Sequence, residues 1–401
     1  MLSAWGLDIE RFAPELTFSI ASAEQREQAF TISTDVVILN TDGVRWLADK
    51  KHPKRMALLK GFDHLIVDES TAYKEPNSQR SKAMVKVSRC FTHRYLMTGT
   101  PNPNSVTELW NQAFIVDGGK RLGESYYKFR NAAQVPTQIG PGTQHLRWDD
   151  KPGIAPVVDE LIRDITIRHA FEDVMTHVPA NFRETKAFTL NKKTKALYDQ
   201  MEASAIIELG EKVISAVHAA SIRTKILQIA SGALYTGAED GGYEVVDRQR
   251  YELIAEIVAE RAHSLVFFNW RHQRDELVTE FKKAGITYAV IDGSVTAHGA
   301  REAVVADYQA GKYQTLLLHP RTGAHGLTLT CGTTTIIASP IYEADLLQQA
   351  IARIHRGGQT KVTNTILVRA EGTVEELVYD KLFGKEARMG DLLGLLKARK
   401  K

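Results

Sequence analysis

The sequence has few residues of the kinds that form cross-links, bind metals or span membranes. Only Cys90 and Cys331 are cysteines among its 401 residues, and they stand far apart with no Cys-x-x-Cys pair. A disulfide framework and a zinc module are therefore not expected, and a reducing cytoplasm fits the composition best. No segment approaches the roughly 20 apolar residues that cross a bilayer, and the amino-terminal residues lack a basic start followed by an apolar stretch. We expect no membrane partner.

The chain also lacks an excess of charge of either sign. Lys and Arg number 51, Asp and Glu number 48, and the formal net charge is +3. This near balance is compatible with a polyanionic partner such as DNA but does not establish one. With 43% hydrophobic and 25% charged residues, the composition is that of a folded globular protein. The length predicts two domains and an insertion.

Short apolar runs separated by helical patterns predict an α/β fold with parallel sheets. Strands are predicted at 35–39, 64–67, 94–97, 264–268, 288–291, 314–318, 335–338 and 365–368. The runs do not alternate with polar residues, which is typical of strands covered on both faces. Helical periodicity dominates the middle of the chain, as in 192–209 and 211–227. We therefore predict four segments: a first lobe (1–117), a helical insertion and linker (118–242), a second lobe (243–384) and a basic tail (385–401).

The first chemically distinctive segment is Leu65-Ile-Val-Asp-Glu-Ser70, an apolar strand that ends in two adjacent carboxylates. Burying them is costly without a partner. A divalent cation bridging nucleotide phosphates would compensate Asp68, and Glu69 would orient and deprotonate an attacking water molecule. The alternative is a strand cap in which Asp68 accepts a helix-terminal amide, and the isolated pair does not decide between the two.

The next candidate strand is followed by the turn Thr98-Gly-Thr-Pro101. Gly99 permits backbone conformations barred to other residues, and Pro101 stops the strand. The hydroxyls of Thr98 and Thr100 are placed to bond across to the acidic pair. Taken alone, the segment is a turn and nothing more.

Two segments near the end of the chain present groups that bind anions. Arg353 and Arg356 are three residues apart, so on a helix they share one face, where a triphosphate would relieve their mutual repulsion. The alternative is an exposed basic helix. In the segment 321–330, two glycines and three threonines follow a strand and offer amides and hydroxyls to phosphate oxygens. Gly323 and Gly326 are equally compatible with a tight entry into a helix.

Taken in order, these segments resemble the motif series of the Swi/Snf-type ATPases of helicase superfamily two, particularly the compact phage and bacterial members. Asp68-Glu-Ser-Thr71 resembles their Asp-Glu-x-His box, and Thr98-Gly-Thr-Pro101 resembles their third motif. Further similar segments are 4–12, 39–44, 267–270, 291–294, 322–330 and 349–359, of which the last ends in the His-Arg-x-Gly-Gln of this branch. The ordered match covers nearly the whole chain.

The resemblance implies two RecA-like parallel-sheet lobes with ATP between them, moving on double-stranded DNA. It implies that Asp68 holds Mg, that Glu69 acts on water and that Arg353 and Arg356 complete the catalytic set. The implied nucleotide contacts are Gln349, Gly326 and Thr98, and the implied nucleic-acid contacts are Asn40, Thr41, Asn269, Thr322 and Gly323. It further implies a monomer in the cytoplasm, that of a bacterial host if the gene is phage-encoded.

The departures from the family pattern concern the phosphate loop. A member should carry Gly-x-x-x-x-Gly-Lys-Thr, with a glutamine ahead of it, before the segment at Ala4, but the sequence contains no Gly-Lys-Ser or Gly-Lys-Thr. The segment Gly118-Gly-Lys-Arg-Leu-Gly123 lacks the hydroxyl residue and follows no predicted strand. We therefore expect a first lobe that is incomplete, poor ATP hydrolysis by this chain alone, and a separate or upstream segment that carries the loop.

Three hypotheses compete at this point. The chain is an ATP-dependent DNA helicase or translocase, a non-catalytic DNA-binding or regulatory remnant of one, or one half of a split motor. An RNA-directed member of the superfamily is less favoured because of the ending Arg353-Ile-His-Arg-Gly-Gly-Gln359.

Overall fold

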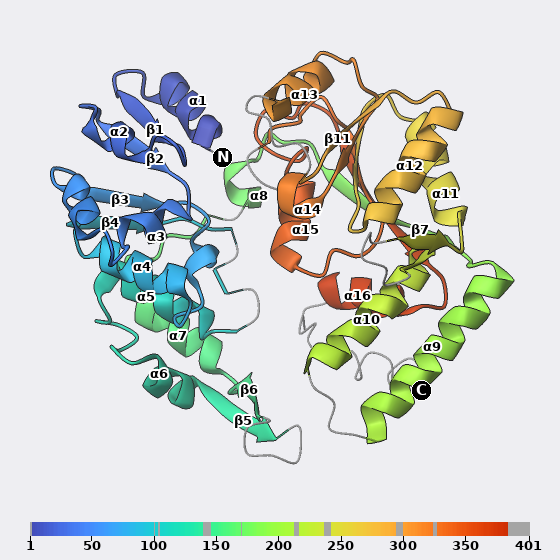
Figure 1. The fold of residues 1–401 in the computed structure, drawn as a ribbon, viewed down its shortest axis with the longest axis horizontal. Helices are drawn as coiled ribbons and strands as arrows, with labels where there is room; N and C mark the ends of the chain where they lie inside the picture. Colours follow the sequence, from blue (N-terminus) through green and yellow to red (C-terminus); the bar gives the residue numbers. More distant parts are fainter. Residues whose placement is uncertain are drawn as a thin grey trace. The chain divides into compact units, whose positions relative to one another are not determined.

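The computed structural model describes residues 2–99, 101–102, 105–138, 146–169, 171–211, 216–235, 242–293, 300–323 and 327–383. The chain forms two compact units, Met1–His169 and Ala170–Lys401, which are described separately (Figure 1). The boundary between them falls inside the stretch 118–242. None of the helices in these ranges is long and apolar enough to cross a membrane.

The first unit combines short helices with short strands. Its helices are α1 (Leu2–Phe12), α2 (Arg26–Thr31), α3 (Gly43–Leu47), α4 (Gln79–Ser88), α5 (Glu108–Asp117), α6 (Tyr126–Ala133) and α7 (Ile154–Ile162), with the 3-10 helices η1 (Pro53–Leu59), η2 (Ser70–Tyr73) and η3 (Arg163–Ile165). Its strands are β1 (Phe18–Ala21), β2 (Val36–Leu39), β3 (His64–Val67), β4 (His93–Leu96), β5 (Gln134–Gln138) and β6 (Leu146–Asp150).

The strands of the first unit form three pairs. β1 lies parallel to β2, β3 lies parallel to β4, and β5 and β6 form an antiparallel hairpin. Beneath β3, the buried Val67 packs with Met84 and Val87 of α4 and with Ile115 of α5. Helices α5, α6 and α7 enclose a second apolar cluster around Trp110. The first cluster also includes Leu96 of β4, so it joins β3 and β4 to α5.

One face of the β3–β4 pair differs from the prediction of strands covered on both faces. Ile66 is 57% exposed and Tyr95 is 51% exposed, whereas their neighbour Val67 is buried. The prediction fails here because apolar residues occupy both faces of the strand while the described residues cover only one.

The second unit is larger. Its helices are α8 (Phe171–Val174), α9 (Lys192–Glu211), α10 (Ala216–Ala230), α11 (Gln249–Ala259), α12 (Arg271–Lys283), α13 (Ala300–Gln309), α14 (Pro320–Gly323), α15 (Ala344–Ile351) and α16 (Val374–Phe383). Its strands are β7 (Asn181–Phe188), β8 (Ala233–Tyr235), β9 (Tyr243–Val245), β10 (Ser264–Phe267), β11 (Tyr288–Ile291), β12 (Thr315–Leu318), β13 (Thr334–Ile337) and β14 (Thr363–Ala370).

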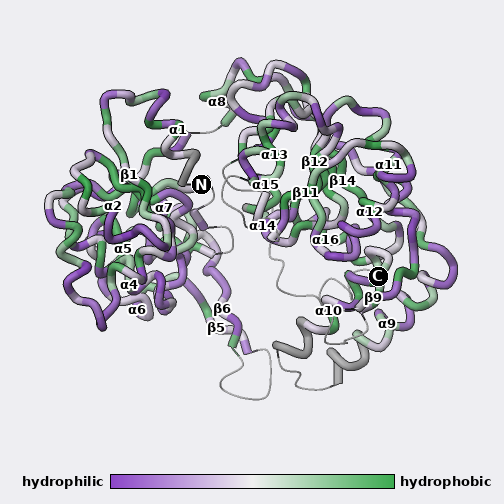
Figure 2. The backbone as a smooth tube through the Cα atoms, turned by 45° about the horizontal axis from the view of Figure 1, so that its top comes forward, coloured by the Kyte–Doolittle hydropathy of each residue, from purple (hydrophilic) through white to green (hydrophobic). Residues whose placement is uncertain are grey.

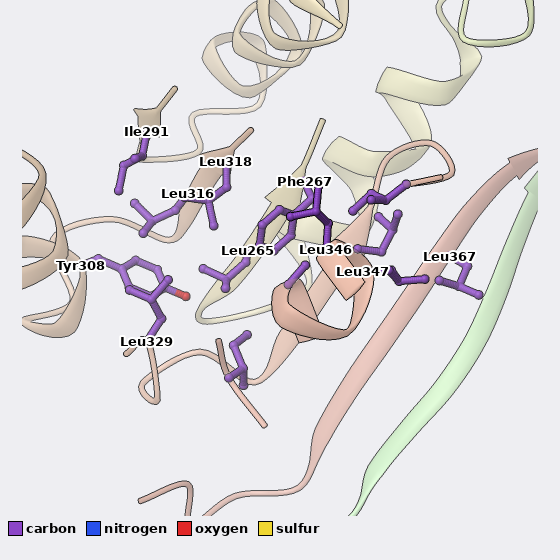
Figure 3. Packing of buried hydrophobic residues seen from close by; sticks show 14 of the residues in the cluster. Leu265, Phe267, Ile291, Tyr308, Leu316, Leu318, Leu329, Leu346, Leu347 and Leu367 are labelled. Atoms are coloured by element: carbon purple, nitrogen blue, oxygen red, sulfur yellow. The ribbon is translucent and has the colours of Figure 1, made fainter. Parts of the chain in front are cut away.

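Six of these strands form one parallel sheet in the order β11-β12-β10-β13-β14-β7. Alternate residues of β10 face opposite sides. Leu265 and Phe267 join a cluster with α13 and α15 (Figure 3). Val266 packs on the other side with α11 and α12. The hydrophobic colour of β12 and β14 in Figure 2 follows from this two-sided cover. The predicted α/β class with a parallel sheet is confirmed.

All eight strands predicted from apolar runs are present. Those at 64–67 and 288–291 have the predicted bounds, and the ends of the others differ by at most two residues. The stretch 118–242, predicted as a helical insertion and linker, also contains the strands β5, β6, β7 and β8. β7 reads Asn181-Phe-Arg-Glu-Thr-Lys-Ala-Phe188, too polar to be recognised as a sheet strand. It pairs with β14 as the edge of the sheet, where one side of the strand meets solvent and tolerates polar residues.

Candidate functional site

The acidic pair follows β3 directly, as predicted. The carboxylate of Asp68 accepts the Glu69 amide through Oδ1 (2.8 Å) and the indole N–H of Trp5 through Oδ2 (3.2 Å). The amide belongs to the residue that caps η2, so the strand-cap interpretation is partly realised. Each oxygen retains a further lone pair for another partner. Trp5, which orients the carboxylate from α1, was not predicted.

Glu69 adopts a left-handed backbone conformation, with φ 51° and ψ 52°. It is the only non-glycine residue with positive φ among those that the structure describes. Such a conformation is costly for a residue with a Cβ, and strained residues of this kind cluster at functional sites. The turn redirects the chain immediately after Asp68, so the two carboxylates do not follow the alternation of a strand.

Asp68 and Glu69 form the acidic turn after β3. The turn after β4 lies next to it because β3 and β4 are parallel neighbours. The Ser70 amide donates to the carbonyl oxygen of Met97 (3.0 Å), and the Met97 amide donates to that of Val67 (2.8 Å). The structure therefore brings the segment that begins at Thr98 beside Asp68 and Glu69. Thr100 lies outside the described residues.

Gln112 of α5 joins these two turns. Its Oε1 accepts the buried hydroxyl of Ser70 (2.7 Å), and its Nε2 donates to the carbonyl of Pro101 (2.6 Å) and to that of Glu108 (2.9 Å). Because Gln112 is bonded to both turns, a displacement of one turn would also displace the other. Its signal in the sequence was a polar residue on an apolar helix, Leu109-Trp-Asn-Gln-Ala113.

The acidic turn fits a magnesium ion that takes most of its ligands from elsewhere. The described residues contain no group of three or more His, Cys, Asp or Glu side chains placed to hold a metal. Mg²⁺ is commonly held by one or two carboxylates, with phosphate oxygens and water completing the octahedron. The single carboxylate of Asp68 is compatible with that mode and with no fully proteinaceous metal site.

The arginine pair does not lie on a helix, contrary to the prediction. α15 ends at Ile351, and Arg353 and Arg356 follow in turns before Gly358, whose φ is +91°. They nevertheless converge, since Nη1 of each donates to the carbonyl oxygen of Leu327, at 3.0 and 3.2 Å. Arg353 Nε also donates to the carbonyl of Gln349 (2.9 Å).

Gln359 holds the same region together and was not predicted as a site residue. This buried side chain donates to the carbonyls of Thr330 (3.1 Å) and Gly332 (3.0 Å), and its oxygen accepts the amides of Thr360 and Lys361. Gln359 thus ties the segment that carries Arg353 and Arg356 to residues 330–332, which follow α14 in the chain. Gly326, a predicted nucleotide contact, lies outside the described residues.

The predicted nucleic-acid residues of the first unit lie at the end of β2. Asn40 Oδ1 accepts the Gly43 amide (2.9 Å) and Nη2 of Arg26 (3.3 Å), which fixes the start of α3. The carbonyl of Thr41 accepts the Tyr73 hydroxyl (3.4 Å). Both residues are half-buried, with a local structural role in addition to any contact with a ligand.

The predicted nucleic-acid residues of the second unit lie at its strand ends. Asn269 Nδ2 donates to the carbonyl oxygens of Ser339 (3.2 Å) and Pro340 (2.9 Å) and to the Ser339 hydroxyl (2.9 Å). Thr322 is half-buried in α14. A Cβ on Gly323 would lie 2.8 Å from the Cβ of Leu318, so packing alone requires glycine there.

A cavity of about 200 Å³ opens at the carboxyl ends of β10, β12 and β13 in the second unit. Its lining comprises Thr224, Leu227, Asn269, Trp270, His319, Pro320, Arg321, Tyr342, Glu343 and Leu346. Arg321 pairs with Glu343 at 2.8 Å, and burial lowers the pKa of His319. Parallel sheets bind ligands at this end, where connections leave in opposite directions.

Two family matches cover most of the chain. Residues 1–232 match the SNF2-related domain, and residues 249–358 match the helicase conserved C-terminal domain.

Among curated proteins, putative protein p41 of Acyrthosiphon pisum secondary endosymbiont phage 1 is 29% identical, over 95% of this chain and 82% of its own length. Chromodomain-helicase-DNA-binding protein 1-like of Mus musculus is 24% identical, over 96% of this chain. Putative ATP-dependent helicase/translocase YwqA of Bacillus subtilis is 22% identical, over 94% of this chain. The chain spans only 42% of the mouse protein and 40% of YwqA.

A solved structure, the Sulfolobus solfataricus SWI2/SNF2 ATPase core in complex with dsDNA, is 19% identical over 100% of this chain and 82% of that chain, with a TM-score of 0.43.

Proposed function

The chain belongs to the SNF2-related family, and we propose that it is an ATP-driven motor that acts on double-stranded DNA. The observation that carries the proposal is the meeting of the acidic turn with the turn at Thr98 at adjacent strand ends, tied by Gln112. A chain that only bound DNA would not need a strained glutamate beside a metal-binding carboxylate.

In this proposal, Asp68 holds a magnesium ion that neutralises charge on the phosphates of ATP. Glu69 orients the attacking water and accepts its proton. Thr98 reports the state of the nucleotide to the rest of the unit. The roles of these three side chains depend on the pairing of β3 with β4, which places the ends of the two strands side by side.

Arg353 and Arg356 of the second unit stabilise the charge that develops on the same triphosphate. Both guanidiniums donate to one neutral carbonyl, that of Leu327. A phosphate oxygen carries negative charge and forms stronger bonds with guanidinium, so it would draw these donors away. We propose that Gln349 and Gly326 complete the nucleotide contacts of this unit.

DNA contacts are proposed for residues at the strand ends of each unit. In the first unit they are Asn40 and Thr41, and in the second unit Asn269, Thr322 and Gly323. Amides and hydroxyls of this kind contact phosphates and position a protein without reading sequence. A relative encoded by a phage makes the cytoplasm of a bacterial host the compartment that we propose.

Binding of ATP by these 401 residues alone should be weak, because they contain no Gly-Lys-Ser or Gly-Lys-Thr. We propose that a further polypeptide segment supplies the phosphate loop. The exposed Ile66 and Tyr95 on the β3–β4 pair support this, because an apolar face of this kind is usually covered in a finished domain.

The lack of a Gly-Lys-Ser or Gly-Lys-Thr sequence also favours a second candidate function, a DNA-binding or regulatory remnant that no longer hydrolyses ATP. Hydrolysis stimulated by duplex DNA separates the two. We expect a slow rate, below about 1 per second, that Glu69→Gln abolishes and that Glu24→Gln, an exposed carboxylate in a turn, leaves unchanged.

The outcomes of this assay are distinct. A rate at or above about 1 per second would contradict the proposed weakness of the phosphate grip. A DNA-stimulated rate that Glu69→Gln leaves unaltered would remove the motor and leave the remnant. Competition between duplex DNA and RNA for binding tests the choice of nucleic acid, and a preference for RNA would contradict it.

A further inference from the structure

A guanidinium of the first unit contacts two aromatic rings. The Cζ of Arg130, on α6, is 3.8 Å from the centroid of the Trp148 ring on β6 and 5.4 Å from that of Tyr127 on α6. The contact with the Trp148 ring orients the plane of the guanidinium. Tyr127 is itself held by a hydrogen bond from Asn77 to its hydroxyl (3.3 Å).

No carboxylate neutralises this arginine among the residues that the structure describes. Arg130 forms no ion pair in those ranges, and its Nε is buried without a hydrogen-bond partner. Burying a donor in this state costs stability, which the contact with the rings offsets only in part. What sets this arginine apart is the lack of an ion pair within the described part of the fold.

A second arginine–tryptophan pair in the same unit shows the structural version of this contact. Arg55 lies 4.5 Å from the centroid of Trp46, and its Nη1 donates to Asp49 (3.4 Å) and to the backbone of Trp46 (3.4 Å). That guanidinium is neutralised within the fold. Arg130, unlike Arg55, has no carboxylate partner among the described residues. An anionic ligand would supply the negative charge that Asp49 supplies to Arg55.

The surrounding sequence favours a polyanion. Between Glu124 and Asp149 the chain contains no Asp or Glu, although 48 of its 401 residues are acidic. The same stretch carries Lys128, Arg130 and Arg147. Arg147 is paired with Asp149 (3.0 Å), so Lys128 and Arg130 supply the available charge.

We propose that Tyr127, Arg130 and Trp148 form a nucleic-acid contact in which the terminal Nη groups of the guanidinium bind a backbone phosphate. Planar guanidinium donors match phosphate oxygens in geometry and charge. Tyr127, 55% exposed, covers the side of the contact and presents a ring on which an unpaired base can stack. This inference rests on the proposed action on DNA and adds a contact outside the strand-end residues.

The test uses the whole chain with a fluorescent DNA duplex and with one of its single strands, followed by anisotropy at several salt concentrations. Arg130→Gln should weaken binding about 3- to 10-fold and lower the slope of log affinity against log salt by about 1. Arg130→Lys should lie between wild type and Arg130→Gln, because it keeps the charge and loses the fork. The matched control is Arg55→Gln, which removes a neutralised guanidinium and should change affinity less than about 2-fold.

Tyr127→Ala distinguishes the source of the phosphate and is safe for folding because the side chain is largely exposed. A larger loss for the single strand assigns the contact to an unpaired segment, and equal losses assign it to the duplex; either result supports the contact.

If Arg130→Gln and Arg55→Gln behave alike while wild type binds DNA, the inference is wrong and the motor proposal stands. If wild type binds neither nucleic acid, both fail. If Arg130→Gln weakens only the binding of a poly-glutamate peptide, the surface recognises an acidic polypeptide and the inference is wrong.

Discussion

Replacing Glu69 by glycine should make the first unit more stable while removing an acidic side chain from the proposed site. At φ 51° and ψ 52°, Glu69 holds a conformation that costs an L-residue about 1–2 kcal/mol. Glycine adopts it freely but loses about 0.5–1 kcal/mol more in backbone entropy on folding. The expected gain in the free energy of unfolding is the difference, about 0.5–1 kcal/mol.

Urea unfolding of the whole chain measures this gain, and hydrogen exchange of the amides in β3 and η2 locates it. Glu69→Gln keeps the Cβ and should leave stability unchanged, whereas Glu69→Asn should fall between glutamine and glycine because asparagine tolerates this region. Glu69→Gly should also abolish any DNA-stimulated ATP hydrolysis. If Glu69→Gly is no more stable than Glu69→Gln, position 69 stores no strain and its backbone gives no support for a functional role.

Three further predictions concern the supports of the two units. Gln112→Leu should lower the free energy of unfolding by about 2–3 kcal/mol, because it leaves the buried Ser70 hydroxyl without its acceptor; urea unfolding measures this, and exposed Gln28→Leu should have little effect. Burial, with a smaller contribution from Arg250, lowers the pKa of His272 from 6.5 to about 3. Below pH 6.5 the imidazole of His272 is therefore protonated in the unfolded chain but neutral in the folded chain. This difference should lower the free energy of unfolding by about 2 kcal/mol between pH 8 and pH 5. Urea titrations of His272→Gln should lack that part of the pH dependence, and an unchanged slope would show that His272 is not buried as a neutral ring. Arg250→Met should cost about 3–5 kcal/mol by leaving the carboxylate of Glu375 buried and unpaired, and adding Glu375→Gln should recover part of the loss.

The elements of the sheets were predictable because their signals are local. Runs such as Ser264–Phe267 are apolar on both faces, and a strand covered by helices on both sides requires that. β7 was missed for the converse reason, since an edge strand with solvent beside it carries no such run. The exposed face at Ile66 was missed because the sequence of β3 does not reveal which of its faces other elements cover.

The site was predictable to the level of which residues follow which strand. Parallel pairing of β3 with β4 brought Glu69 near Thr98, as their positions after strands required. Arg353 and Arg356 were expected to share one face of a helix, but both lie beyond the end of α15. Their side chains still meet, because both donate to the carbonyl oxygen of Leu327. The ties made by Gln112 and Gln359 join residues that are distant in sequence, and no periodicity reports such contacts.

The proposed function depends most on one untested proposal, that Asp68 of the first unit and Arg356 of the second act on the same ATP. The direct test is a double-mutant cycle on the affinity of the whole chain for a fluorescent ATP analogue in the presence of magnesium. Asp68→Asn and Arg356→Ala should each weaken binding, and their effects should differ from additivity by roughly 0.5–3 kcal/mol, as for residues that share a ligand. Full additivity, or an affinity that Arg356→Ala leaves unchanged, would contradict the claim.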